Sequence, residues 1–183
     1  KDRYSKLTTI EKKPIITAAL NYLVHKELKM EGLTSGEKIE NLVNEIASAR
    51  GIHNISDINM NFAVATVDTI STKECIFLSK KYDLKNDDID YIYDIPIGKA
   101  IRASMSFPGI FTTCNFGKYN FIDGGTKDNL PVKILKDMGA EKVIALSFRL
   151  DDYIPSNNML SVLLRTVDIF SLKDVRVAQK MAD

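Results

Sequence analysis

The sequence predicts an α/β domain, and three observations support this fold class. Two short and almost wholly apolar runs, 61–67 and 74–79, have the composition of neighbouring strands buried in a sheet. Two segments, 34–51 and 95–106, carry apolar residues at helical spacing. A strand, a helix and a further strand follow one another over 119–148, which predicts a right-handed parallel crossover. Helices that alternate with short strands in this way are typical of α/β proteins.

The composition is that of an ordinary globular domain. The 183 residues, of which 45% are hydrophobic and 27% charged, suffice for one domain with a sizeable core. Because 25 Lys and Arg nearly balance 24 Asp and Glu, we expect no nucleic-acid partner. The charged start KDRYSKLTTIEKK is unlike a signal peptide, and no run approaches the roughly 18 to 20 apolar residues of a membrane helix. We therefore expect a cytoplasmic protein, with peripheral membrane contact left open.

The residues that usually bind metals show no ligand pattern. Cys75 and Cys114 lie far apart, without a C-x-x-C pair or a neighbouring histidine, so neither a disulfide framework nor a zinc site is indicated. The acidic run at 87–90 lacks the glycine and the terminal glutamate of an EF-hand loop, which favours a solvated loop over a calcium site. We expect no metal, no cofactor and a reducing compartment.

Two helices are predicted in the first third of the chain. The segment 14–30 begins with a proline, which suits the first turn of a helix. The segment 34–51 has Thr34 and Glu37 at the spacing of a capping box, and Gly51 provides a stop. The second of these helices has the clearer boundaries.

The middle and the end of the chain continue the alternation. The polar segment 80–94 is predicted to be a surface loop, and the helix at 95–106 ends before Pro108. A hairpin over 114–123 turns at a Gly-Lys pair. The remaining predicted elements are a helix at 130–139, a buried strand at 142–148 and a helix at 159–183.

The most informative stretch is FIDGGTKDNLPV, residues 121–132, in which an apolar strand ends on a carboxylate followed by two glycines. The carboxyl end of a strand is where open parallel sheets place ligands. Gly124 and Gly125 have no side chains, so another backbone or a reacting hydroxyl can approach Asp123. The alternative is an Asp-Gly turn whose carboxylate merely caps the following helix, and spacing alone leaves both open.

Three linked motifs over residues 99–148 resemble the patatin-like phospholipases, the bacterial-type lipid acyl hydrolases: KAIRASMSFPGIF, YNFIDGGTKDNLPV and MGAEKVIALSF. Two upstream stretches are also similar to that family, GLTSGEKIENLV and MNFAVATVDT. The resemblance is best over 30–150. It implies a three-layer α/β/α sandwich in which 1–183 form a single incomplete domain. The first strands, the glycine-rich oxyanion loop and the nucleophile elbow of that family belong upstream of these residues.

The resemblance also implies a reaction. In that family a serine on a G-x-S-x-G elbow attacks a lipid ester, and the aspartate of a D-G-G motif activates it without a histidine. Carried over by position, this aspartate is Asp123, and Gly124 and Gly125 support the site. A carboxylate with the usual pKa of about 3.9 is a poor base at neutral pH unless burial raises its pKa. His25 and His53 have no motif around them, so we expect surface or packing roles for both.

No G-x-S-x-G occurs in these 183 residues, so the nucleophile is expected to be missing from the chain. GLTSG at 32–36 reads G-x-T-x-G, but it is predicted to follow a helix, and helix capping explains Thr34. Ser104 and Ser106 lack the paired glycines of an elbow and suit close helix packing. Arg102 is expected to anchor a loop or a carboxylate.

The resemblance implies a lipid or acyl ester substrate for the parent protein, while the chain as given is expected to be inactive. Absent first strands would leave sheet edges uncovered, and uncovered edges favour self-association. SKKYDLK and YIYDIP mix basic and aromatic residues, as a surface that touches a membrane does. The alternative function is a non-catalytic α/β binding or assembly module in which the DGG motif is only a turn.

Overall fold

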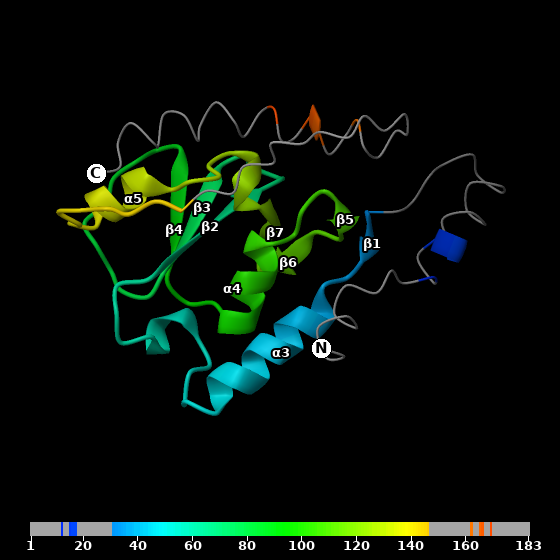
Figure 1. Cartoon of the computed structure of the whole chain (residues 1–183), viewed down its shortest axis with the longest axis horizontal. Helices are drawn as coiled ribbons and strands as arrows, with labels where there is room; N and C mark the ends of the chain where they lie inside the picture. The colour runs from blue at the N-terminus through cyan, green and yellow to red at the C-terminus, as the bar shows by residue number, and fades with distance from the viewer. Residues whose placement is uncertain are drawn as a thin grey trace.

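The structure is a computed structural model that describes residues 31–146, together with isolated helical positions at 12, 15–17, 162, 165–166 and 169 (Figure 1). Most of the two predicted helices at 14–30 and 159–183 lies outside the described residues, and so does His25. Within the described part, no helix is long and apolar enough to span a membrane.

A five-stranded sheet forms the centre of the described part, in the order β4-β3-β2-β7-β6. Its strands are β2 (Ala63–Asp68), β3 (Glu74–Leu78), β4 (Ile89–Ile92), β6 (Cys114–Phe116) and β7 (Tyr119–Asp123). β3 and β4 are parallel, and the other neighbouring pairs are antiparallel. The predicted adjacent strands at 61–67 and 74–79 and the predicted hairpin at 114–123 are therefore confirmed.

Helices cover both faces of this sheet (Figure 1). α4 (Ile97–Ser104) buries Ala100 and Ala103 against Val64, Phe77 and Phe121. On the opposite face, α5 (Val132–Asp137) buries Ile134 against Ile76 and Leu78. α3 (Glu37–Ser48) packs on the outer side of α4, and residues 31–146 also contain two short 3₁₀ turns, η1 (Ile55–Asp57) and η2 (Gly124–Thr126). The predicted α/β class is confirmed.

Both cysteines lie in the layer between α4 and the sheet. Cys75 and Cys114 are free and completely buried. Burial raises the pKa of the Cys75 thiol to about 12, and it also raises the pKa of Cys114. Both side chains therefore act as small apolar groups in the core.

The predicted capping box of the second helix is wrong. Thr34 belongs to β1 (Gly32–Thr34), which pairs in parallel with β5 (Gly109–Phe111) in a separate two-stranded sheet. The Thr34 carbonyl accepts a 2.9 Å hydrogen bond from the N–H of Thr112, and this pairing holds Thr34 in extended backbone. Gly36, with φ 73, is the N-cap of α3 instead, without a side-chain cap.

Three further expectations are corrected. The segment 80–94 is not wholly a loop, because it contains β4.

The part of 142–148 that the structure describes, 142–146, forms no strand, and Ile144 and Leu146 are 88% and 83% exposed. Only Val143 is buried there, against the cluster around Leu130 and Val132. A strand needs a neighbour for its backbone hydrogen bonds, and no described strand pairs with this segment. The predicted parallel crossover is therefore absent from the described residues.

Candidate active site

Asp123 is the last residue of β7, and its backbone is fixed from three sides. Its N–H donates a 3.0 Å hydrogen bond to the carbonyl of Ser106, just beyond α4. Its carbonyl accepts a 2.7 Å bond from the hydroxyl of Thr126. Opposite it on β2, the Thr66 hydroxyl donates to the carbonyl of Ile122 at 2.6 Å. Elements from three parts of the chain thus determine where the carboxyl group lies.

The position of Asp123 at a strand end is as predicted, but its setting differs. β7 is antiparallel to both of its neighbours, so this is not the carboxyl edge of a parallel sheet. What converges on Asp123 is the end of α4 and the turn η2. The site is therefore built by the end of a helix and by a turn, rather than by the loops that follow successive parallel strands.

The carboxyl group of Asp123 both caps a turn and is half-buried. Its Oδ1 accepts a 2.7 Å hydrogen bond from the N–H of Gly125, which makes Asp123 the N-cap of η2. Burial raises the pKa of Asp123, and the hydrogen bond from Gly125 offsets this in part. A raised pKa is the direction that a general base needs to work near neutral pH.

The two glycines after Asp123 meet different neighbours. A Cβ atom on Gly124 would lie 2.4 Å from the carbonyl oxygen of Ala65, so the backbone of the turn rests directly on β2. A Cβ atom on Gly125 would lie 2.9 Å from Oδ1 of Asn129 and 3.1 Å from Oδ1 of Asp123. Gly124 therefore permits close backbone packing, while Gly125 leaves space beside the carboxylate.

The end of α4 behind the site is held by polar contacts. Ser106 is 1% exposed, and its hydroxyl donates to the carbonyl of Arg102 at 2.8 Å. Arg102 forms an ion pair with Glu40 of α3 at 3.2 Å, and Lys99 approaches the same carboxylate at 3.0 Å. Arg102 is thus an anchor for a carboxylate, as expected. The hydroxyl of Ser106 bonds its own helix, which agrees with the expected structural role.

The other sequence candidates lie elsewhere. Thr34 is 4% exposed and belongs to the two-stranded sheet rather than to the sheet of Asp123. GLTSG thus forms a strand and a turn into α3, and the helix expected before it lies outside the described residues. His53 is exposed beside η1. In the acidic run, Asp90 lies on β4 and pairs with Lys73 at 3.5 Å. Within the described residues, no three potential metal ligands gather in one place.

One buried carboxylate, that of Asp68, was not predicted from the sequence. Asp68 ends β2 and is 2% exposed. It accepts hydrogen bonds from the N–H of Ser71 at 2.8 Å, the hydroxyl of Ser71 at 2.7 Å and the N–H of Asn120 at 2.8 Å. It therefore ties the turn after β2 to β7. An aspartate followed by a serine three residues later, directly after an apolar strand, is the turn signal that could have revealed it.

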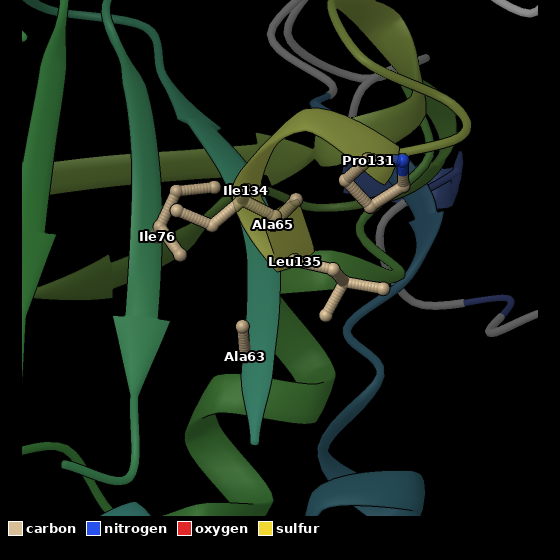
Figure 2. A pocket seen from close by; sticks show the side chains of 6 residues that line it. All are labelled: Ala63, Ala65, Ile76, Pro131, Ile134 and Leu135. Carbon is tan, nitrogen blue, oxygen red and sulfur yellow. The ribbon is translucent and has the colours of Figure 1, made fainter. Parts of the chain in front are cut away.

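An apolar hollow of about 120 Å³ lies on the α5 face of the sheet (Figure 2). Figure 2 shows that the side chains around it come from β2, from β3, and from α5 with its N-cap Pro131. The lining residues are Ala63, Ala65, Ile76, Pro131, Ile134 and Leu135. Because these side chains are all hydrocarbon, the hollow suits an apolar group and offers no side chain for chemistry.

Comparison with known proteins identifies the family. The patatin-like phospholipase family model matches residues 7–136. Over 58 residues the chain is 43% identical to lysophospholipase NTE1 of Debaryomyces hansenii, and 41% identical to the proteins of that name from Meyerozyma guilliermondii and Candida albicans. Each match covers 31% of this chain and only 4% of the relative. Since the family model spans more than half of the chain, the protein belongs to the patatin-like phospholipase family.

Proposed function

We propose that the chain is part of a serine lipid acyl hydrolase that works through a Ser-Asp dyad, in which Asp123 is the base. Membership of the family and the similarity to lysophospholipases support the class of reaction. The observation that carries the assignment of Asp123 is its half-buried carboxyl group, held by the Gly125 N–H at the end of β7. The nucleophilic serine lies outside these 183 residues in this proposal, because no G-x-S-x-G occurs among them.

The proposed reaction has two halves. Asp123 takes the proton of the serine hydroxyl while the serine oxygen attacks the ester carbonyl carbon. The tetrahedral intermediate then expels the alcohol, which receives the proton from Asp123, and an acyl-serine ester remains. In the second half, Asp123 takes a proton from a water molecule that attacks this ester, and the serine recovers its proton as the fatty acid leaves. Atoms and protons balance with a single carboxylate, so no histidine is needed.

The substrate in this proposal is a lipid or another acyl ester, and contact with it takes place at a membrane surface from the cytoplasm. The lysophospholipase relatives support the substrate class. Two free and buried cysteines agree with a reducing compartment. Exposed Lys80 and Lys81 directly precede the partly buried Tyr82, and this mix of basic and aromatic residues suits contact with a membrane.

Self-association belongs to the same proposal. Ile144 and Leu146 are highly exposed for their size. β7 pairs with β2 only as far as Thr66, so no strand pairs with Ala63 on that side within the described residues. An unpaired strand edge and exposed apolar side chains each favour contact with another chain.

The alternative is a non-catalytic α/β binding or assembly module in which the DGG motif is only a turn. The hydrogen bond from Gly125 to Asp123 favours it, because that bond alone gives the carboxylate a structural reason to be there.

One substitution separates the two readings. In the protein with its upstream region present, Asp123→Asn keeps the size and most hydrogen bonds of the side chain but removes the base. We expect hydrolysis of a p-nitrophenyl acyl ester and of a lysophospholipid to fall by about three orders of magnitude or more, with little change in melting temperature. The matched control is Asp83→Asn, at an exposed aspartate that pairs only with Lys85 among the described residues. Activity near that of the wild type in Asp123→Asn would support the alternative.

A further inference from the structure

Asn129 and Asp123 border the same small space. The position that a Cβ atom of Gly125 would occupy lies 2.9 Å from Oδ1 of Asn129 and 3.1 Å from Oδ1 of Asp123. Both polar groups therefore face the volume that the missing side chain leaves open. Asn129 is exposed and sits between the turn η2 and α5, so its amide can rotate without disturbing a packed core.

The carboxylate of Asp123 can accept more hydrogen bonds than it does. Within residues 31–146, the bond from the N–H of Gly125 is the one hydrogen bond that this carboxyl group accepts. An ionised carboxylate can accept about four, and a half-buried anion that accepts few bonds is poorly stabilised. A second donor at this place would hold the carboxylate ionised and fix its orientation.

The charged residues of the same loop are engaged elsewhere. The ammonium group of Lys127 donates to the carbonyl of Thr72 at 3.1 Å. Oδ1 of Asp128 accepts a 3.2 Å bond from the N–H of Leu130. Of the elements packed against Asp123, β2 presents Thr66 and the end of α4 presents Ser106, and neither is charged. The neutral amide of Asn129 is thus the polar side chain left beside the carboxylate.

We propose that Asn129 is a positioning residue for Asp123: its side-chain amide, turned so that Nδ2 replaces Oδ1 at the space beside Gly125, donates a hydrogen bond to the ionised carboxylate. This inference rests on the proposed function, because a base that abstracts a proton is the reason to hold this carboxylate in one orientation. The N–H of Gly125 already donates to Oδ1 of Asp123, and the amide of Asn129 would hold the same oxygen from a second direction. The requirement for an empty position at Gly125 follows, since any side chain there would separate the two groups.

The first test measures Asp123 directly and needs no hydrolysis. The carboxyl carbon of Asp123 is titrated by ¹³C NMR in the 183-residue chain, and its signal is identified by its loss in Asp123→Asn. We expect Asn129→Ala to raise the pKa of Asp123 by about half a unit to one unit, because a donor to the charged form is lost. Asn129→Asp, which keeps the size but adds a negative charge, should raise it further. Asn115→Ala, at an exposed asparagine on β6, is the matched control and should leave the pKa unchanged.

The second test uses the protein with its upstream region and measures the pH dependence of kcat. Asn129→Ala should lower kcat by about tenfold with little change in KM and move the acidic limb of the profile to higher pH. If Asp123→Asn abolishes activity while Asn129→Ala changes neither the pKa nor the profile, this inference is wrong and the proposed function stands. If Asp123→Asn remains active, the proposed function fails, and the NMR titration still decides whether the amide contacts the carboxylate.

Discussion

The backbone N–H of Asp123 donates a 3.0 Å hydrogen bond to the carbonyl oxygen of Ser106. This bond joins the end of β7 to the end of α4, and the Arg102–Glu40 ion pair joins α4 to α3. The main chain of the proposed base is therefore attached to the end of α4, which α3 holds in turn through a side-chain ion pair. The predictions below test how the described residues hold this arrangement.

The first prediction concerns the chain as it stands. The 183-residue polypeptide should hydrolyse a p-nitrophenyl acyl ester no faster than a heat-denatured sample, because in the proposed function the serine that Asp123 activates lies outside these residues. Ser106→Ala should change nothing in this assay, since its hydroxyl is bonded to Arg102 inside the fold. Turnover that survives repurification and is lost in Ser106→Ala would contradict both statements.

The second prediction concerns Asp68. Asp68→Ala removes a buried acceptor of three hydrogen bonds, those from Ser71 and Asn120, so the free energy of unfolding should fall by about 2 to 4 kcal/mol. Urea denaturation at pH 7 measures this loss, with Asp83→Ala at an exposed position as the control. A loss below that of the control would show that the turn after β2 holds without this carboxylate.

Asp68 also predicts an acid dependence of stability. Burial acts to raise its pKa, but the hydrogen bonds from Ser71 and Asn120 outweigh burial, and the pKa of Asp68 is lowered in the folded chain. Its stabilisation is therefore present above the pKa of the unfolded chain, near 3.8, and is lost as the pH falls through the lower folded value. Denaturation curves collected between pH 6 and pH 2 should converge for the wild type and Asp68→Asn at the acid end.

The third prediction concerns Glu74 at the start of β3. Burial, with a smaller contribution from Asp128, raises the pKa of Glu74 to about 7, although Lys127 and Lys133 oppose the shift. Because the folded pKa lies above the value of 4.5 in the unfolded chain, stability should fall as the pH rises from about 4.5 to 7. At pH 8, Glu74→Gln should therefore be more stable than the wild type by about 1 kcal/mol, after allowance for screening by water.

Urea denaturation at pH 4 and pH 8 checks this prediction. At pH 4 the carboxyl group of Glu74 is protonated in the folded chain, so the gain from Glu74→Gln should nearly vanish there. Glu141→Gln, at an exposed position, is the control and should show no comparable pH dependence. A gain of equal size at both pH values would assign the effect to packing rather than to charge.

The fourth prediction concerns Gly124. A methyl group there would meet the carbonyl of Ala65 at 2.4 Å, so Gly124→Ala must push η2 away from β2. We expect a loss of about 2 to 4 kcal/mol in the free energy of unfolding. In the protein with its upstream region, kcat should also fall, because the displaced turn carries the Asp123 carboxylate with it. A variant with normal stability and kcat would show that the turn tolerates a side chain.

The sequence predicted the elements whose pattern is long enough to read. The twelve-residue α3 stands out through its helical periodicity, and the hairpin that ends at Asp123 stands out through its Gly-Lys turn. β1 and β5 have three residues each, too few for an alternation, and they exist because they pair with one another. The apolar run at 142–148 predicted a strand, but its described part, 142–146, has no partner strand, and local composition cannot supply one.

The candidate site was only partly visible in the sequence. Asp123 stood out through the DGG motif and the family resemblance. That its main chain is bonded to Ser106, and that Thr66 faces it from β2, depends on contacts between distant segments. Asn129 lies only a few residues away, but its relation to Asp123 depends on how the turn folds around Gly125.

The reactivity of the two buried cysteines can be used to measure how often the layer between α4 and the sheet opens. Cys75 lies on β3 and Cys114 on β6, both under α4, and both thiols are shielded from water in the folded chain. A thiol reagent can modify them only when this layer opens, so the rate of labelling measures that opening without any engineered probe. Two sites on different strands would also reveal by mass spectrometry whether β3 and β6 open together or one after the other.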